Sequence, residues 1–332
     1  MFIVQSYGAA IVFCVITMFC WGSWANTQKL AAKSWRFELF YWDYVLGIVI
    51  FSILSAFTLG SNGTQGRAFM ADLAQAGSNS IISALIGGVI FNAANILFSA
   101  AISNAGMAVA FPIGIGIALV LGVLLNYFAV QQGNPVYLFL GVGLVCVAII
   151  LNALAFRKAG EQSAKVSTKG IILSILAGVL MSFFYRFIAG AMDLESFASP
   201  AVGKMTPYTA VLVFSVGILL SNFLFNTILM KKPFSGQPVT YSDYFNGNFK
   251  THLTGILGGL IWGLGNSLNL VAAGKAGPAI SYGLGQGATL IAALWGILIW
   301  KEFKNAPKGT NTLLGSMLAA YLVGLAFIVF AR

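Results

Sequence analysis

The stretch "GGLIWGLGNSLNLVAAGKAG", Gly258 to Gly277, carries a single charge and is long enough to cross about 30 Å of hydrocarbon as a helix. Shifting the chain by 171 positions lays this stretch, without a gap, on "GGVIFNAANILFSAAISNAG", Gly87 to Gly106. The leading glycine pair, the asparagines Asn95 and Asn266 and the closing Ala-Gly all coincide. Glycine and alanine often match by chance in membrane helices. The asparagine pair and the GxG patterns that follow in register nevertheless favour an internal duplication.

The composition requires lipid as the main solvent of this chain. The sequence is 59% hydrophobic and only 8% charged over 332 residues, which is too few charges to cover a soluble globule of this size. Runs of roughly 20 residues that are apolar on nearly every side recur along the chain, unlike the alternating pattern of a β-barrel. These runs predict about ten membrane-spanning helices, near 7–30, 40–60, 80–102, 107–130, 136–156, 169–190, 206–230, 251–273, 279–300 and 311–331.

The repeat and the number of spans together predict the architecture. Each half holds five helices, an odd number, so the two copies must cross the bilayer in opposite directions. We therefore expect an all-α polytopic membrane protein built from two inverted five-helix repeats, 1–156 and 169–332, joined by a cytoplasmic linker at 157–168. Inverted repeats are common in secondary transporters, in which the substrate site lies near the bilayer midplane between the halves.

The net charge of +10 comes from basic residues that are scattered at helix ends. This distribution indicates topology signals and not a nucleic-acid partner. With the N-terminus outside, the cytoplasmic side collects roughly thirteen of them: Lys29, Lys33, Arg36, Arg157, Lys158, Lys165, Lys169, Lys231, Lys232, Lys250, Lys301, Lys304 and Lys308. The outer side keeps Arg67, Lys204, Lys275 and Arg332. We expect a multi-pass protein of a bacterial inner membrane with both termini in the periplasm.

Processing signals and disulfides are not expected. No basic leader or cleavage motif surrounds the first apolar run, so this run is expected to remain as a span. The cysteines Cys14, Cys20 and Cys146 fall inside predicted spans and are interpreted as packing residues. The longest polar connection, Lys231 to His252, is interpreted as a cytoplasmic loop with a tyrosine-anchored interfacial segment.

Polar and aromatic residues share one face at the end of the first span. Trp21, Trp24 and Gln28 are spaced as on one side of a helix. On a face turned to a water-accessible cavity, the indoles would supply stacking walls and the amide would supply directional hydrogen bonds. The alternative is an aromatic belt at the membrane interface, where tryptophan is common.

Two further spans carry amides at mid-depth. The third span places Asn92 and Asn95 on one face, and the eighth places Trp262, Asn266 and Asn269 on its counterpart. Buried amides in a membrane must face protein or water. As plain helix contacts they contribute only about 0.6–2 kcal/mol each, and this packing role remains an alternative. The repeat relation between Asn95 and Asn266 favours a substrate site instead.

The ninth and sixth spans add further candidates. Tyr282 and Gln286 follow one face of "SYGLGQGATL", and their repeat counterparts, Phe111 and Ile115, are apolar. This one-sided polarity suits a ligand better than a symmetric scaffold. Tyr185 and Arg186 lie in the sixth span; the alternative for Arg186 is a side chain that extends to the lipid headgroups.

Proton coupling has only three candidate carboxylates. No acidic residue lies squarely at mid-membrane, and the best candidates are Asp43 at the start of the second span, Glu302 at the end of the ninth and Glu195 at an outer mouth. A charged cap at a helix end is the alternative for all three. The single histidine, His252, sits at a loop-helix junction, and no catalytic or metal-binding motif is present. An enzyme is not expected.

Several motifs, in the same order along nearly all ten spans, resemble the ureide permease family of the drug/metabolite transporter superfamily. They are Gly22-x-Trp24, "YWDYVLG" in the second span, "YTAVLVFSVG" in the seventh, "GGLIWGLGNSLNLVAAGKAG" in the eighth and "LWGILIWKEF" closing the ninth. The resemblance implies a ten-helix inverted-repeat fold and proton-linked uptake of oxo derivatives of nitrogen heterocycles. The matching positions are Trp24, Asp43, Gly265, Asn266, Trp295 and Glu302. Plant members carry a long central loop with a nucleotide-binding-like motif, whereas only Arg157–Lys169 stands here.

We therefore expect a secondary active transporter, a symporter that takes up a small neutral heterocycle such as a ureide, nucleobase or nucleoside-like solute. Its expected partners are this solute, protons and the lipid bilayer. No cofactor, metal or nucleic acid is expected, and nothing indicates an oligomeric state. A sugar or pentose porter of the same fold is the nearest alternative, because tryptophan and asparagine also bind sugars. A non-transporting membrane sensor or assembly component is the next.

Overall fold

The computed structural model describes residues 1–32, 34–159 and 167–332. Within these residues, ten helices or composite helices are long and apolar enough to cross a membrane, which confirms the predicted all-α fold. Eight of the ten spans are single helices: α1 (Tyr7–Ala31), α2 (Phe37–Phe57), α4 (Ser78–Ala105), α7 (Pro135–Ala159), α8 (Thr168–Ala191), α9 (Pro207–Lys231), α11 (Phe249–Ala276) and α14 (Thr310–Val329).

The remaining two spans are composite. The fourth contains α5 (Met107–Ala110), the π-helical turn η1 (Phe111–Ile115) and α6 (Gly116–Ala129). The ninth contains α12 (Pro278–Gly285), α13 (Ala288–Leu294) and the π-helical turn η2 (Trp295–Ile299). Two short helices, α3 (Phe69–Gln75) and α10 (Tyr241–Phe245), lie in the polar connections. The α10 segment falls within the long loop that the sequence predicted.

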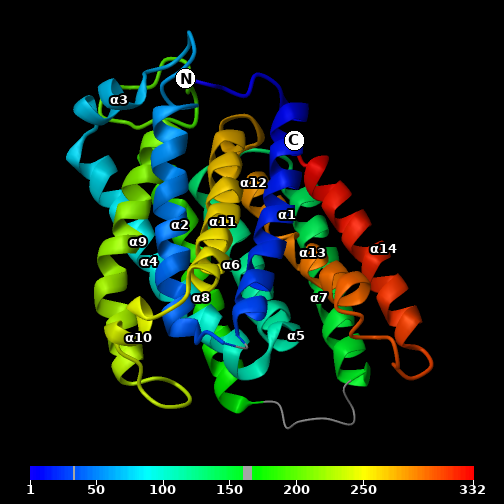
Figure 1. Ribbon diagram of the computed structural model, residues 1–332. Helices are drawn as coiled ribbons and strands as arrows, with labels where there is room; N and C mark the ends of the chain where they lie inside the picture. Colours follow the sequence, from blue (N-terminus) through cyan, green and yellow to red (C-terminus); the bar gives the residue numbers. More distant parts are fainter. Residues whose placement is uncertain (33, 160–166) are drawn as a thin grey trace.

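The division at 157–168 stays a prediction. Helix α7 continues through Arg157 and Lys158, and α8 begins at Thr168; residues 160–166 of the proposed linker lie outside the described residues. Both chain termini lie at one end of the helix bundle, which we name the terminal end (Figure 1). The ends of α7 and α8 that flank the linker lie at the opposite end, which we name the basic end (Figure 1).

Local signals set the helix ends. Ser6 caps α1, where its hydroxyl accepts a bond from the amide of Ala9, and Asn248 caps α11 by accepting from Thr251. Helices α4 and α11 both end at a glycine with positive φ, 77° at Gly106 and 81° at Gly277. A side chain is disfavoured in that conformation, so glycine permits the turn into the next short helix.

The helix bounds agree with the 171-residue repeat. Helices α4 and α11 are each 28 residues long, and both their first and last residues are 171 positions apart. The terminating glycines Gly106 and Gly277 have the same spacing. The short helices α3 and α10 also occupy corresponding places in the two halves. These correspondences are consistent with the inverted repeat.

The two halves interlock. Helix α1 packs on α11, and α4 packs on α8, so each half contributes its first and third spans to the other. Glycines bring the backbones together where α11 meets α2 and where α4 meets α9. A Cβ atom at Gly259 would lie 2.0 Å from the carbonyl oxygen of Tyr44, and one at its repeat counterpart, Gly88, would lie 2.1 Å from that of Phe214.

Polar contacts close the terminal end of the bundle. The buried carboxylate of Asp72 accepts from the Arg67 guanidinium at 2.9 Å and from the Thr206 amide at 2.7 Å. Arg67 also donates to the carbonyl oxygens of Ala201 and Lys204. These bonds tie the α2–α3 connection to the α8–α9 connection across the two halves.

Candidate functional site

A small cavity lies between the two halves. Residues from α1, α4, α8 and α11 and from both composite spans line it, and its volume is about 30 Å³. Five of its lining residues are candidates from the sequence: Trp21, Trp24, Asn95, Trp262 and Gln286. A space of this size holds a few waters at most, so a heterocycle would require the walls to move apart. The conformation is therefore closed around the central site.

Both composite spans depart from a regular α-helix where they reach this cavity, the fourth by a π-helical turn and the ninth by a short break. In the fourth span, the π-helical turn η1 contributes Phe111 and Ile115 to the lining. In the ninth, α12 ends at Gly285, and Gln286 lines the cavity before α13 begins. These positions are repeat counterparts. Interrupted helices at corresponding places of two halves mark the binding site in several transporter folds.

Stacked aromatic rings form the apolar part of the cavity wall. The rings of Trp21 and Trp262 are nearly parallel, at 9°, with centroids 6.0 Å apart. The ring centroids of Phe91 and Trp262 are 4.2 Å apart, and those of Trp24 and Tyr44 are 4.8 Å apart. Within the described chain the indole nitrogen of Trp21 has no hydrogen-bond partner. Flat aromatic walls of this kind suit a planar or ring-shaped solute.

The amides near the cavity differ in how they are paired. Asn95 lines the cavity and donates weakly, at 3.4 Å, to the hydroxyl of Tyr41. Asn266 is buried one turn beyond Trp262, but it is not among the residues that line the cavity. Neither amide atom of Asn266 finds a partner in the described part of the chain. The structure thus brings Asn95 and Gln286 to the cavity and leaves Asn266 beside it.

Other predicted residues are engaged in bonds between helices. Asn92 accepts from Tyr41 at 3.1 Å and donates to Ser221 at 2.9 Å. Asn269 donates to the carbonyl oxygen of Ser281 at 2.8 Å. The hydroxyl of Tyr282 donates to the carbonyl oxygen of Ala118 at 3.2 Å.

Two residues of α8 have different surroundings. The Tyr185 ring is fully buried against Tyr282, with their centroids 5.1 Å apart. Arg186 is exposed on the surface of the helix bundle. Tyr185 is therefore close to the central cavity in the packing, and Arg186 is not.

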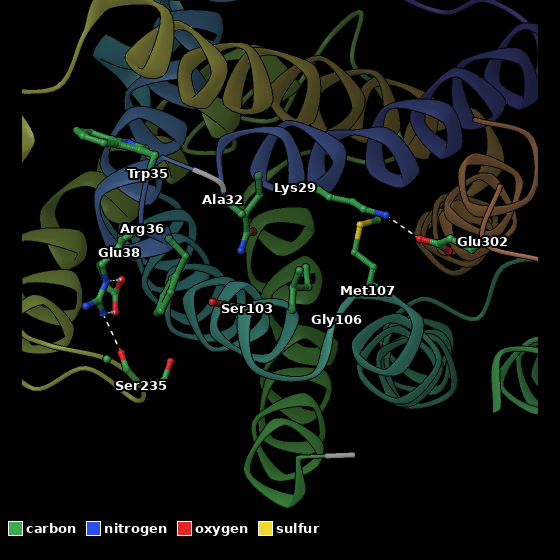
Figure 2. Close-up of a pocket in the computed structure, with 14 residues that line it drawn as sticks. Lys29, Ala32, Trp35, Arg36, Glu38, Ser103, Gly106, Met107, Ser235 and Glu302 are labelled. Carbon is green, nitrogen blue, oxygen red and sulfur yellow. Dashed lines mark hydrogen bonds and ion pairs between the residues drawn. The ribbon is translucent and has the colours of Figure 1, made fainter. Parts of the chain in front are cut away.

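A wide vestibule opens at the basic end. Its volume is about 590 Å³, and its walls come from the end of α1, the start of α2, the end of α4 and the α9–α10 connection. Gln28 lines this vestibule and donates to the carbonyl oxygen of Ser99 at 3.0 Å. Figure 2 shows Arg36 paired with Glu38 and bonded to Ser235 on one side of the vestibule. Gln28 therefore belongs to the entrance and not to the central cavity.

A second ion pair lies across the vestibule. Lys29 contacts Glu302 at 2.6 Å (Figure 2), and its ammonium group lies 4.2 Å from the ring of Trp300. A small pocket shares Lys29 and Glu302 with the vestibule and shares Phe111 with the central cavity. Phe111 therefore lies between the central cavity and the pocket that adjoins the vestibule.

Asp43 lies in a separate cluster. Its buried carboxylate contacts Nδ1 of His252 at 2.8 Å and 3.0 Å and accepts from the Tyr244 hydroxyl at 2.7 Å. Burial first, and then the neighbouring Asp43 carboxylate, raises the pKa of Tyr244 above its usual range, so this phenol stays protonated. Glu195, by contrast, is exposed in the α8–α9 connection. The sequence identified Asp43 but missed His252 and Tyr244 as its partners.

The fold and the cavity define a polytopic α-helical membrane protein with an aromatic and amide-lined cavity between its two halves. The sequence model of the ureide permease family, described as "Ureide permease", matches residues 40–169 and 157–331. The chain belongs to the ureide permease family.

Curated relatives include plant and bacterial proteins. Ureide permease 1 of Arabidopsis thaliana is 24% identical over 384 aligned residues, which cover 99% of this chain and 98% of the relative. Probable ureide permease A3 of Vigna unguiculata is 24% identical and covers 93% of this chain and 99% of its own length. A putative sugar uptake protein of Listeria innocua is 25% identical, over 75% of this chain and 79% of the relative. These relatives are named as permeases or uptake proteins and not as enzymes.

A solved structure has the same overall fold. It aligns with 97% of this chain and 96% of its own chain, with a TM-score of 0.60 and 14% sequence identity. At this identity the similarity supports the arrangement of the helices alone.

Proposed function

We propose that this protein takes up a small neutral heterocycle, such as a ureide, nucleobase or nucleoside-like solute, by proton-coupled alternating access. The observation that carries the proposal is the central cavity, where Trp21, Trp24 and Trp262 stand beside the amides of Asn95 and Gln286. Aromatic faces stack on a flat ring, and amides both donate and accept, as the edge of such a ring requires. The named activity of the plant ureide permeases supports this substrate class.

Alternating access is supported by the asymmetry between the two ends of the bundle. The terminal end is closed by the bonds of Asp72 and Arg67, whereas the basic end holds a vestibule of about 590 Å³. The excess of basic residues favours a cytoplasmic location for the vestibule and periplasmic termini in a bacterial inner membrane. In this assignment the conformation is closed outward and faces the cytoplasm, and Phe111 lies between the central site and the pocket that adjoins the vestibule. Asp43, Glu195 and Glu302 remain the candidate proton-coupling carboxylates.

A sugar porter is the second candidate, because the Listeria relatives are named as putative sugar uptake proteins. Tryptophan rings also stack on sugars, and amides also bind hydroxyls, so the same cavity residues would serve this second class.

A thermal-shift screen of the purified protein against uracil, allantoin, ribose and glucose tests the substrate class, because a ligand that binds the folded form stabilises it. Uptake of the same labelled compounds into proteoliposomes then tests transport. Stabilisation by ribose or glucose alone would favour the sugar porter, and the absence of any solute movement would refute the transporter. Gln286→Ala should weaken binding by about 5- to 150-fold, the equivalent of roughly 1–3 kcal/mol.

A further inference from the structure

Three acidic side chains are buried in the described part of the chain, and they differ in the type of partner. Glu38 pairs with Arg36 at 2.6 Å, and Asp72 pairs with Arg67 at 2.9 Å. A guanidinium stays charged at every physiological pH, so each of these carboxylates has a permanent positive partner. Asp43 instead contacts the imidazole of His252 at 2.8 Å, and this ring carries a charge only when it is protonated.

The other described carboxylates are poorer proton sites. Glu302 pairs with Lys29, and both side chains are about one-third exposed. Asp193, Glu195 and Asp243 lie in connections between spans, and Asp243 caps α10 through Thr240. Among the residues that the structure describes, Asp43 is thus the one buried carboxylate whose ion-pair partner has no permanent charge.

The Asp43–His252 pair lies next to the wall of the vestibule at the basic end. The His252 side chain is 21% exposed, and its ring lies 5.2 Å from Trp35, which lines the vestibule. Asp43 itself is almost fully buried between α2 and α11. Gly255 permits this close packing, because a Cβ there would lie 2.4 Å from the Cβ of Asp43.

The groups that face the pair are few. From α10, Tyr244 donates to Asp43, and Asp243 is exposed and bonded to Thr240. From the start of α2, Glu38 is already paired with Arg36, and on α11 Lys250 is exposed. No other ionisable side chain of the described chain bonds to Asp43 or His252. The carboxylate and the imidazole are therefore the two groups of this cluster between which a bound proton could lie.

Two helices connect the pair to the central cavity. On α2, Tyr41 is bonded to Asn95 and Tyr44 packs on Trp24, and these tyrosines flank Asp43 within one turn. On α11, His252 and Trp262 belong to one continuous helix, separated by about 15 Å at 1.5 Å per residue. A change in the separation of α2 and α11 at Asp43 would thus move residues that line the substrate cavity.

We infer that the Asp43–His252 pair, held by Tyr244, is the proton-binding site that couples proton movement to solute transport. This inference rests on the proposed function. In each transport cycle with bound solute, the pair binds one proton and releases it through the imidazole toward the vestibule. Tyr244 keeps its own proton throughout and only donates to the carboxylate. In the conformation described, the pair faces the end at which an uptake transporter releases its proton.

The test separates coupling from binding and exchange. Proteoliposomes hold the wild-type protein, Asp43→Asn, His252→Gln or the control Asp243→Asn. The control removes one negative charge from α10, next to Tyr244, and keeps a capping oxygen. The probe is whichever of uracil, allantoin, ribose and glucose gives the largest thermal shift with the wild-type protein. Accumulation is measured with the interior one pH unit more alkaline, and exchange is measured with equal pH and equal solute on both sides.

With one proton per solute, the wild-type protein and Asp243→Asn should concentrate the probe about tenfold under this gradient. Asp43→Asn and His252→Gln should lose accumulation but keep the thermal shift and the exchange. Accumulation at the wild-type level in both variants overturns the inference. If both variants lose exchange as well as accumulation, the inference is also overturned, because the pair would then have only a structural role. A wild-type protein that binds and moves none of the probes overturns the proposed function itself, and the inference with it.

Discussion

Replacing Asn266 by leucine should make the folded protein more stable and its substrate binding weaker. The side chain is 1% exposed, and neither of its amide atoms has a partner in the described part of the chain. A buried polar group without a hydrogen bond costs about 1–3 kcal/mol, and an apolar group of the same shape does not incur this cost. We therefore expect Asn266→Leu to raise the free energy of unfolding by about 1–3 kcal/mol in the absence of solute.

The affinity should change in the opposite direction. If a bound solute provides the missing partner of Asn266, the leucine variant loses that bond, and its affinity should fall by about 5- to 150-fold. Asn269→Leu is the matched control, one turn further along the same helix. Asn269 donates to the carbonyl oxygen of Ser281 at 2.8 Å, and only its Oδ1 lacks a partner in the described part of the chain, so its replacement should stabilise the protein less than Asn266→Leu does.

Unfolding in detergent, followed with and without the solute found by thermal shift, measures both effects. A decrease of about 0.6–2 kcal/mol for Asn266→Leu, with unchanged affinity, would refute the reasoning. Asn266 would then act as an ordinary contact between helices.

Three further predictions concern packing and charge. Gly259→Ala should lower the thermal stability by about 1–3 kcal/mol, because its Cβ would lie 2.0 Å from the carbonyl oxygen of Tyr44, whereas Gly315→Ala has open space and should be neutral in the same unfolding assay. Lys29→Met combined with Glu302→Gln should change the stability by no more than about 1 kcal/mol, since both side chains are about one-third exposed; a larger loss would indicate that the pair holds the vestibule in place. The stability advantage of wild type over Tyr244→Phe should be constant up to about pH 10 and decline above it. The pKa of Tyr244 is raised in the folded state, so above about pH 10 the unfolded chain releases the phenol proton while the folded chain still keeps it. An advantage that instead declines between pH 7 and 9 would contradict the assignment.

The sequence was sufficient for the spans because their signal is local. A run of apolar residues must cross the hydrocarbon whatever surrounds it, and the predicted span 7–30 corresponds to α1 at Tyr7–Ala31. The shared spacing of Gly106 and Gly277 likewise agrees with the helix ends that the structure places there. The interruption at Gln286 was not predicted, although the glycines around it were noted, because hydropathy does not distinguish a continuous helix from one with a turn.

The candidate site could be predicted only in part. Trp21, Trp24, Trp262, Asn95 and Gln286 were identified by their type and depth, and all five line the cavity. Periodicity fixes the face of a helix but not its neighbour, so it could not tell that Asn92 bonds to Ser221 or that Gln28 faces the vestibule. The partnership of His252 with Asp43 spans 209 positions in the sequence. The one available signal was that both residues lie at the predicted cytoplasmic ends of their spans.

Because the two halves interlock, α1 is synthesised well before the helix that it packs against. The hydroxyl of Thr17 on α1 donates to the carbonyl oxygen of Gly265 on α11, 248 positions later in the chain. A ribosome adds roughly 5–20 residues per second, so roughly 12–50 s pass between the synthesis of Thr17 and that of Gly265. During that interval the Thr17 hydroxyl has only its partner within α1, the carbonyl oxygen of Phe13, and the face of α1 that packs on α11 is uncovered.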